Sequence, residues 1–192
     1  AELLGDAVEN YFDNLLPDNQ AIRMRLKQQF GTDSTAAADL LAAIGRDCVG
    51  AVQLLPDGLL PPAHQQIEAT PITEGKIESL LGSLQSTDRM ALGQGGADDF
   101  RISIAGAQEK TALLKMSSSK GAAKRWFVPH GATPTTHILK LPLGLVGNMQ
   151  ADMRDSVENE WLCLALLREL GLSVAQAEIG RFGDKKALLV ER

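Results

Sequence analysis

The chain has 192 residues, of which 44% are hydrophobic and 22% are charged, proportions that are ordinary for a globular protein. This length is enough for one large domain or for two smaller ones with cores of their own. The net charge of −5 and the aromatic content of 4% exclude an overall basic surface and leave little for a base-stacking platform. No apolar run is long enough to span a membrane and no signal peptide opens the chain, so we expect a cytoplasmic protein.

The first half of the chain is expected to be mostly helical. Residues 3–16 carry apolar side chains at helical spacing, and Pro17 ends that pattern. The expected elements are helices at 3–16, 19–30, 35–45 and 73–85 and a buried strand at 49–55. The glycine-rich stretch 93–99 is the best candidate for a flexible hinge, which makes residues 1–92 a helical subdomain.

The second half, residues 100–192, changes to alternating apolar strands around one helix. The expected strands cover 100–104, 110–116, 126–129, 136–141, 175–181 and 186–191, and the expected helix covers 157–170. Residues 117–124 are interpreted as a hairpin loop and 149–155 as a linker. The whole chain is therefore expected to be α+β, with an antiparallel sheet and one inserted helix in its second half.

Two cysteines, Cys48 and Cys163, lie within apolar runs, and we expect both to be reduced and buried. Both chain ends read as cut. Ala1 begins almost directly in a helical pattern, and Arg192 follows an apolar run without a terminator. These features favour a fragment of a longer protein.

A short loop of small residues between two of the expected strands is a candidate phosphate-binding loop. It consists of Ala105, Gly106, Ala107, Gln108, Glu109 and Lys110. Small residues let backbone N–H groups approach an anion closely. Because the loop has a single glycine, a plain structural turn remains the alternative interpretation.

Lys140 lies within the apolar strand "THILKLP", where an unpaired charge would be costly. It therefore needs a carboxylate or a phosphate, unless it faces solvent on an edge strand. In the helix that follows, Asp155 and Glu158 have the spacing of a capping box, which would occupy Glu158 locally. Glu160 lies at the edge of the buried stripe, so we expect it to face the sheet and pair with Lys140, as a strand lysine and a helix glutamate do in protein kinases.

The final apolar strand "ALLVER" (187–192) ends in a charged pair, and Glu191 lies where the hinge between kinase lobes would begin. Together, "FRISIAGAQEKTALL", "GATPTTHILKLP", "VENEWLCLALLRELGL" and "ALLVER" resemble HipA, the serine/threonine kinase toxin family of bacterial toxin–antitoxin modules. The segments "FDNLLPDN" and "IGRDCVGAVQLLP" resemble the N-terminal subdomain of the same family. The resemblance covers essentially the whole chain.

The resemblance implies ATP and Mg²⁺ as cofactors. It makes 105–110 the phosphate loop, Ser103 the autophosphorylated serine, Lys140 a contact of the ATP phosphates, and Glu191 with the residues beyond it a contact of adenine. It also implies a helix-turn-helix antitoxin of the HipB type, which represses operator DNA together with the toxin. The implied protein substrate is glutamyl-tRNA synthetase, whose phosphorylation would stall translation and favour persistence.

One departure from the kinase pattern concerns catalysis. A catalytic Asp and the metal-binding Asn and Asp are expected after the hinge, and "DFR" at 99–101 precedes the loop and is no substitute. We therefore expect no phosphoryl transfer by the 192 residues alone. Two alternatives stay open, a non-catalytic interaction domain that binds an antitoxin through residues 1–92 and a small-molecule kinase of similar architecture.

Overall fold

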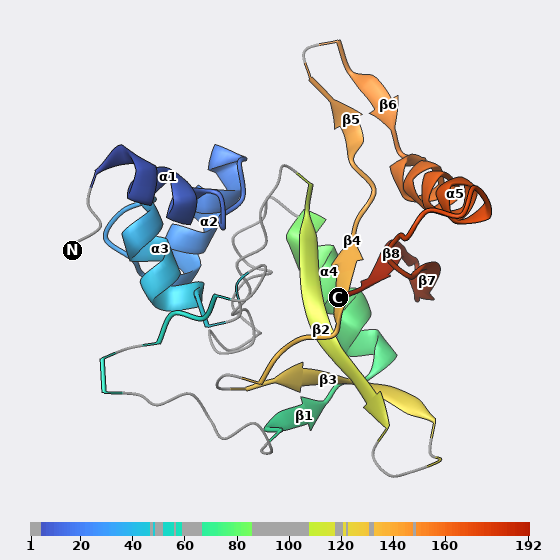
Figure 1. Ribbon diagram of the computed structural model, residues 1–192, viewed down its shortest axis with the longest axis horizontal. Coiled ribbons are helices and arrows are strands. Elements are labelled where there is room, and N and C mark those ends of the chain that lie inside the picture. Colours follow the sequence, from blue (N-terminus) through green and yellow to red (C-terminus); the bar gives the residue numbers. More distant parts are fainter. Residues whose placement is uncertain are drawn as a thin grey trace. The chain divides into compact units, whose positions relative to one another are not determined.

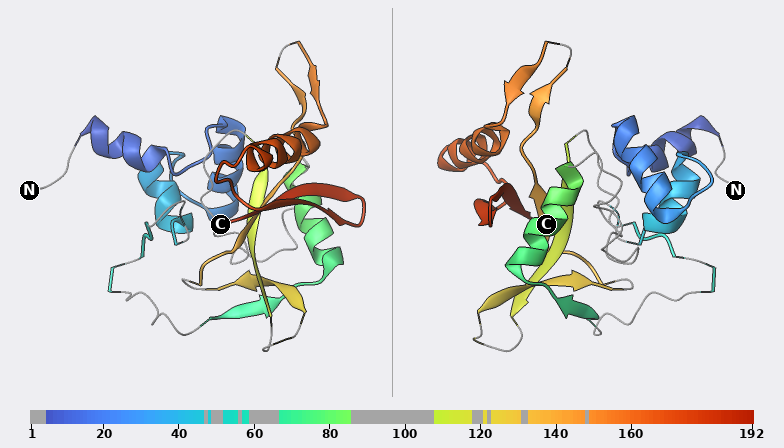
Figure 2. Two further views of the ribbon diagram at one scale, coloured as in Figure 1. Left: turned by 45° about the vertical axis from the view of Figure 1, so that its right-hand side comes forward. Right: turned by 180° about the vertical axis from the view of Figure 1, so that it is seen from behind.

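The structure is a computed structural model of the chain, drawn in Figures 1 and 2. It describes residues 5–46, 48, 52–55, 57–58, 67–85, 108–117, 121, 123–130, 133–147 and 149–192. The chain divides into two compact units, a helical unit and a sheet unit, each with a hydrophobic cluster of its own. The fold is α+β, as the sequence predicts.

The helical unit contains α1 (Asp6–Asp13), α2 (Gln20–Phe30) and α3 (Ala37–Ile44). Asn19 caps α2 by accepting a hydrogen bond from the backbone N–H of Ala21 at 2.8 Å, and Gly31 ends the helix in the left-handed conformation. The core of this unit is formed by Leu15, Leu16, Leu26, Leu40, Leu41, Ile44 and Cys48. The strand expected at 49–55 is wrong for its described part, because residues 52–55 form no strand.

The sheet unit is built on a six-stranded sheet in the order β1-β3-β2-β4-β8-β7. Its strands are β1 (Ala69–Pro71), β2 (Lys110–Ser117), β3 (Lys124–Pro129), β4 (His137–Lys140), β7 (Ala177–Phe182) and β8 (Lys185–Glu191). The pairs β2–β3, β2–β4, β4–β8 and β7–β8 are antiparallel. Strands β4 and β8 are neighbours although a hairpin, a helix and β7 separate them in sequence.

The two faces of the sheet have different partners. On one face Leu139 and Leu141 pack in a cluster with Ile77 and Leu81 of α4 (Glu74–Gln85). Helix α5 (Ser156–Glu169) lies on the other face, over β7 and β8 (Figure 2). Alternate residues of a strand point to opposite faces, so the leucines face α4 while Lys140 faces α5.

The structure moves one predicted boundary. Residues 69–85, with β1 and α4, belong to the sheet unit, whereas the sequence placed them in a helical subdomain ending at 92. The physical reason is that the apolar side chains of α4 need a sheet face to cover them. The predicted hinge at 93–99 lies outside the described residues.

Helix α4 is also tied to the turn between β7 and β8. The Glu78 carboxylate accepts a hydrogen bond from the backbone N–H of Asp184 at 3.0 Å, and Lys185 Nζ donates to Gln85 Oε1 at 3.0 Å. Gly183 sits in this turn with a φ of 56°, in the left-handed region that favours glycine. This turn joins the two strands that the sequence predicts at 175–181 and 186–191.

Two other expectations are wrong. The stretch 149–155, expected to be a linker, contains strand β6 (Ala151–Met153), which pairs with β5 (Gly144–Val146) to form a hairpin. This hairpin stands away from the sheet in Figures 1 and 2. Three residues per strand are too few for a visible alternating pattern. Cys163 is exposed on α5 and only Cys48 is buried, because the apolar stripe of α5 is wider than the face that the sheet covers.

Candidate functional site

The candidate site lies on the sheet face that carries α5. Lys140 of β4 and Glu160 of α5 form the expected ion pair, with 2.5 Å between Nζ and Oε1. Their side chains are 24% and 35% exposed, so the pair is shielded and yet reachable from solvent. The lysine in the apolar strand thus has a carboxylate partner, which removes the cost of an unpaired charge.

Two residues before Glu160, a second carboxylate joins α5 to the sheet. Glu158 Oε1 lies 2.5 Å from Nζ of Lys186 on β8. The hydrogen bond from Lys186 is the main reason that the pKa of Glu158 is lower than usual. The predicted capping box is therefore wrong, because Asp155 makes no side-chain cap and Glu158 turns to the sheet.

A second lysine stands directly beside Lys140. The register of β2 and β4 places Lys110 opposite Lys140, so both side chains share one face of the sheet. Lys110 has a further interaction of its own, so it is not a free cation. Two cations and the Glu160 carboxylate thus concentrate where β2 begins.

The described end of the candidate phosphate loop is held by the chain that follows β4. Gln108 Nε2 donates a hydrogen bond to the Leu141 carbonyl at 2.6 Å, and the Leu141 N–H donates to the Glu109 carbonyl at 3.0 Å. The structure therefore places Gln108 and Glu109 next to the strand that bears Lys140. Ser103, Ala105, Gly106 and Ala107 lie outside the described residues.

An apolar row runs beside the lysines on the same face. The registers place Ala112 of β2 opposite Ile138 of β4, and Ile138 opposite Val190 of β8. Ile138 and Val190 are only partly buried. Residues two apart on a strand are separated by about 7 Å, so this row lies one step along the sheet from Lys110 and Lys140.

Glu191 ends β8, opposite His137. By alternation its side chain lies on the α4 face, away from Lys140, so any contact with a base at the α5 face would come from its main chain. The strand end is fixed, since the backbone N–H of Arg192 donates to the Thr136 carbonyl at 3.0 Å and its guanidinium to the Thr135 hydroxyl. Sequence reasoning missed Lys186 and Val190, which alternation along "KKALLVE" could have placed on the α5 face.

His137 shows what the opposite face contains. Its ring is buried and lies edge-on to Trp126, with 5.2 Å between ring centroids. Burial, and next the positive charge of Lys115, lower the pKa of His137. Lys115 in turn pairs with Glu178 at 2.9 Å, so the α4 face has a lysine–glutamate pair of its own, on the opposite side of the sheet from α5.

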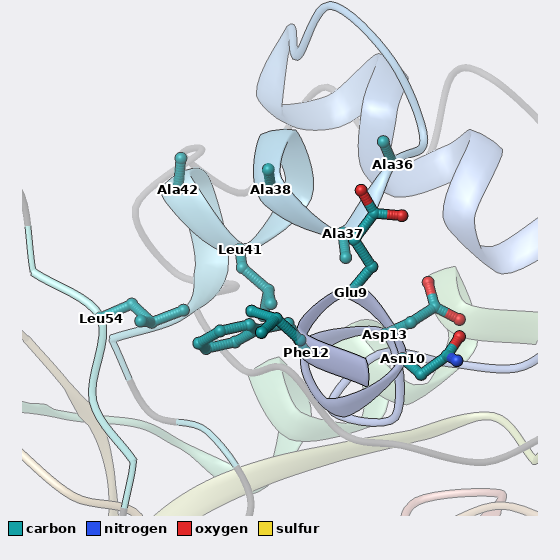
Figure 3. Close-up of a pocket in the computed structure, with 11 residues that line it drawn as sticks. Glu9, Asn10, Phe12, Asp13, Ala36, Ala37, Ala38, Leu41, Ala42 and Leu54 are labelled. Carbon is teal, nitrogen blue, oxygen red and sulfur yellow. The ribbon is translucent and has the colours of Figure 1, made fainter. Parts of the chain in front are cut away.

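The helical unit has a separate feature, an apolar hollow of about 650 Å³ between α1 and α3. Figure 3 shows Phe12, Leu41 and Leu54 close together in it, with Glu9 and Asp13 on the α1 side. A hydrogen bond from Arg23 lowers the pKa of Asp13 and keeps this carboxylate ionised. The hollow is thus apolar inside, with the Glu9 carboxylate and the Asp13–Arg23 ion pair at one edge.

The described residues contain no cluster of three or more His, Cys, Asp or Glu side chains that could hold a metal ion. None of the helices in this part of the chain combines the length and the apolar character that a bilayer crossing requires.

Comparisons with known proteins agree with this geometry. The family model of the HipA N-terminal domain matches residues 2–55, and that of the HipA-like C-terminal domain matches 102–192. The chain is 31% identical over 186 residues to the putative kinase Y4mE of Sinorhizobium fredii, covering 95% of this chain and 40% of the relative. It is 29% identical over 187 residues to the serine/threonine-protein kinase toxin HipA of Shewanella oneidensis, covering 96% and 37%.

A solved structure of HipA with HipB and operator DNA from Shewanella oneidensis gives a TM-score of 0.63 at 30% identity, covering 96% of this chain and 38% of that one. The sheet unit, with its strand lysine and helix glutamate, is a kinase-like N-lobe. The chain belongs to the HipA family. It spans about 40% of the length of the curated relatives that it matches.

Proposed function

We propose that this chain forms the ATP-binding part of a HipA-like serine/threonine protein kinase toxin. The observation that carries the proposal is the Lys140–Glu160 pair on a sheet face that also offers an apolar row. The names of the relatives, a putative kinase and a kinase toxin, support it. Because those relatives are much longer, the activity is proposed for the complete protein.

The residues of this face would divide the nucleotide between them. Lys140, held by Glu160, would contact the phosphates, and the row of Ala112, Ile138 and Val190 would face the adenine ring. The distance between the two rows, about 7 Å, suits a ligand with an apolar base and a charged end. Bound Mg²⁺ would neutralise charge that develops on the phosphates during transfer.

The same proposal extends to the partners of the complete protein. An antitoxin of the HipB type would neutralise the toxin, and the two proteins together would bind operator DNA. The solved assembly from Shewanella, which contains HipA, HipB and operator DNA, supports this proposal. The protein substrate would be a component of translation, with glutamyl-tRNA synthetase as the candidate from the family resemblance. Phosphorylation would then inhibit growth and favour persistence.

The test compares two lysines of the same sheet in the full-length protein. Lys140→Met removes the lysine that pairs with Glu160 on the α5 face, whereas Lys115→Met removes the lysine that pairs with Glu178 on the α4 face. At an ATP concentration 100 times the Kd, ligand binding should stabilise the wild type by about 2.7 kcal/mol. We expect Lys140→Met to lose this protection and the kinase activity, and Lys115→Met to keep both. Normal ATP binding and phosphorylation by Lys140→Met would refute the proposal.

The hollow in the helical unit favours a second function, that of a partner-binding domain. A protein that binds operator DNA carries a basic surface, because the phosphate backbone supplies most of its affinity. An apolar side chain of such a partner, flanked by basic residues, would suit an apolar hollow with Glu9 at its edge. This role is compatible with ATP binding by the sheet unit.

This second function has its own test, which is binding of a purified HipB-type antitoxin to the full-length protein. Ala38→Trp fills the hollow from an exposed position of α3, and Ala7→Trp puts the same side chain on α1 outside the lining. We expect Ala38→Trp to weaken antitoxin binding at least tenfold and Ala7→Trp to leave it unchanged. Equal affinity of the two variants would exclude the hollow as the contact.

A further inference from the structure

Helix α5 is attached to the sheet by few apolar contacts. Among its residues, all of which the structure describes, only Val157 is fully buried. Leu162, Leu166 and Leu170 follow one another at helical spacing along the outer side, and Leu170 is 76% exposed. Apolar burial usually provides most of the stability with which an amphipathic helix holds its place. Within the described residues that contribution is small, so polar contacts provide a larger share of the attachment of α5 to the sheet.

The other contacts are two ion pairs on different strands. Glu160 reaches Lys140 on β4 and Glu158 reaches Lys186 on β8, each at 2.5 Å. Lys186 lies two residues before Leu188, which is opposite Lys140, so both lysines point to the α5 face. The Lys186 and Glu158 side chains are 19% and 44% exposed, against 24% and 35% for Lys140 and Glu160, so the two pairs are shielded from solvent to a similar degree.

We propose that Glu158 and Lys186 are positioning residues of the nucleotide site, which hold α5 so that Glu160 stays on Lys140. The inference rests on the proposed ATP-binding function. A helix attached at one charged point can rotate or shift about that point, whereas attachment to two strands fixes its position. With the β8 contact removed, Glu160 leaves Lys140 for part of the time, and Lys140 is no longer held for phosphate contact.

The expected effect is on ATP affinity. If only a fraction of the molecules has Lys140 in place, the apparent Kd rises in inverse proportion to that fraction. An ion pair that merely adds stability would behave differently. Its loss would lower the unfolding temperature and leave the affinity of the folded protein unchanged.

The experiment uses the full-length protein and measures the Kd for ATP–Mg²⁺ by calorimetry, together with KM and kcat. The variants Lys186→Met and Glu158→Gln keep the shape of each side chain and remove the charge. We expect a Kd about three- to tenfold higher in both, as for other coupled contacts, with KM raised more than kcat is lowered. Glu178→Gln breaks the comparable pair with Lys115 on the opposite face and should leave the Kd unchanged.

Exchanging the two charges of the Glu158–Lys186 pair distinguishes a positioning role from a general loss of stability. Lys186→Glu alone places two carboxylates together and should weaken ATP binding most, and adding Glu158→Lys should restore affinity to within about threefold of the wild type. Hydrogen exchange without nucleotide gives an independent readout, since the α5 amides should exchange faster in Lys186→Met and not in Glu178→Gln.

The outcomes keep the two proposals distinguishable. A wild type that binds no ATP refutes the proposed function and this inference with it. A wild type that binds ATP, with Lys186→Met binding equally well and α5 exchanging at the same rate, overturns the positioning role alone. A lower unfolding temperature with unchanged Kd would likewise show a purely structural ion pair.

Discussion

Replacing Gly183 with alanine should weaken the attachment of α4 to the β7–β8 turn. An added Cβ would lie 2.1 Å from Cδ and 2.2 Å from both carboxylate oxygens of Glu78, so the carboxylate must move. That movement removes the hydrogen bond from the Asp184 N–H, which typically contributes about 0.5–1.5 kcal/mol. Alanine at a φ of 56° adds strain of about 1–2 kcal/mol. The expected total is about 1.5–3.5 kcal/mol.

A substitution at a second glycine distinguishes the cost of backbone strain from the cost of the steric clash with Glu78. Gly171 has a φ of 79°, and an added Cβ there meets nothing within 4 Å, so Gly171→Ala should cost only the strain of about 1–2 kcal/mol. The assay is native-state hydrogen exchange of the β8 amides, which gives the free energy of local opening. In a Glu78→Ala background, Gly183→Ala should cost no more than Gly171→Ala. If Gly183→Ala costs the same with and without Glu78, the collision plays no part and the reasoning is wrong.

Two further predictions concern pH and the helical unit. The pKa of His137 is lowered in the folded protein, so the unfolded chain binds protons first, and stability should be full above about pH 6.5 and fall as the pH drops below it. In His137→Gln, the urea concentration at the unfolding midpoint should change less between pH 7 and pH 5 than in the wild type. The same pH dependence in both proteins would contradict a buried neutral ring. Gly45→Ala places a Cβ 2.5 Å from a backbone carbonyl and should destabilise by about 1–3 kcal/mol in urea unfolding, whereas Gly82→Ala meets an ordinary 3.5 Å contact and should not destabilise. Equal effects of the two alanines would show that the Gly45 site can relax.

The regular helices and long strands could be predicted because their periodicity is local. The expected helix at 73–85 became α4 at Glu74–Gln85, and the expected strand at 110–116 became β2 at Lys110–Ser117. Lys140 and Glu160 could be paired from sequence because strand alternation and helical spacing each fixed one side chain. Strands repeat every two residues and helices every 3.6 residues, and both periods are visible in a single sequence.

The remainder depended on contacts between segments far apart in the chain. Glu158 satisfies a local capping pattern, yet the distant Lys186 competes for it and the ion pair forms instead. The hairpin β5–β6 is too short to show alternation, and the exposure of Cys163 depends on how much of α5 the sheet covers. No local pattern contains this information.

The pairing of β4 with β8 also affects how the sheet unit can fold. The hairpin β5–β6, helix α5 and strand β7 all lie between these two strands in sequence, so their pairing must close a long loop. Closing a long loop costs chain entropy before its contacts compensate, which slows folding. Strands β7 and β8 are joined by a tight turn and can pair early. The Lys140–Glu160 contact spans only 20 residues and does not need this closure, but the apolar row beside it includes Val190 of β8. The candidate nucleotide site would therefore be complete only once β4 has paired with β8.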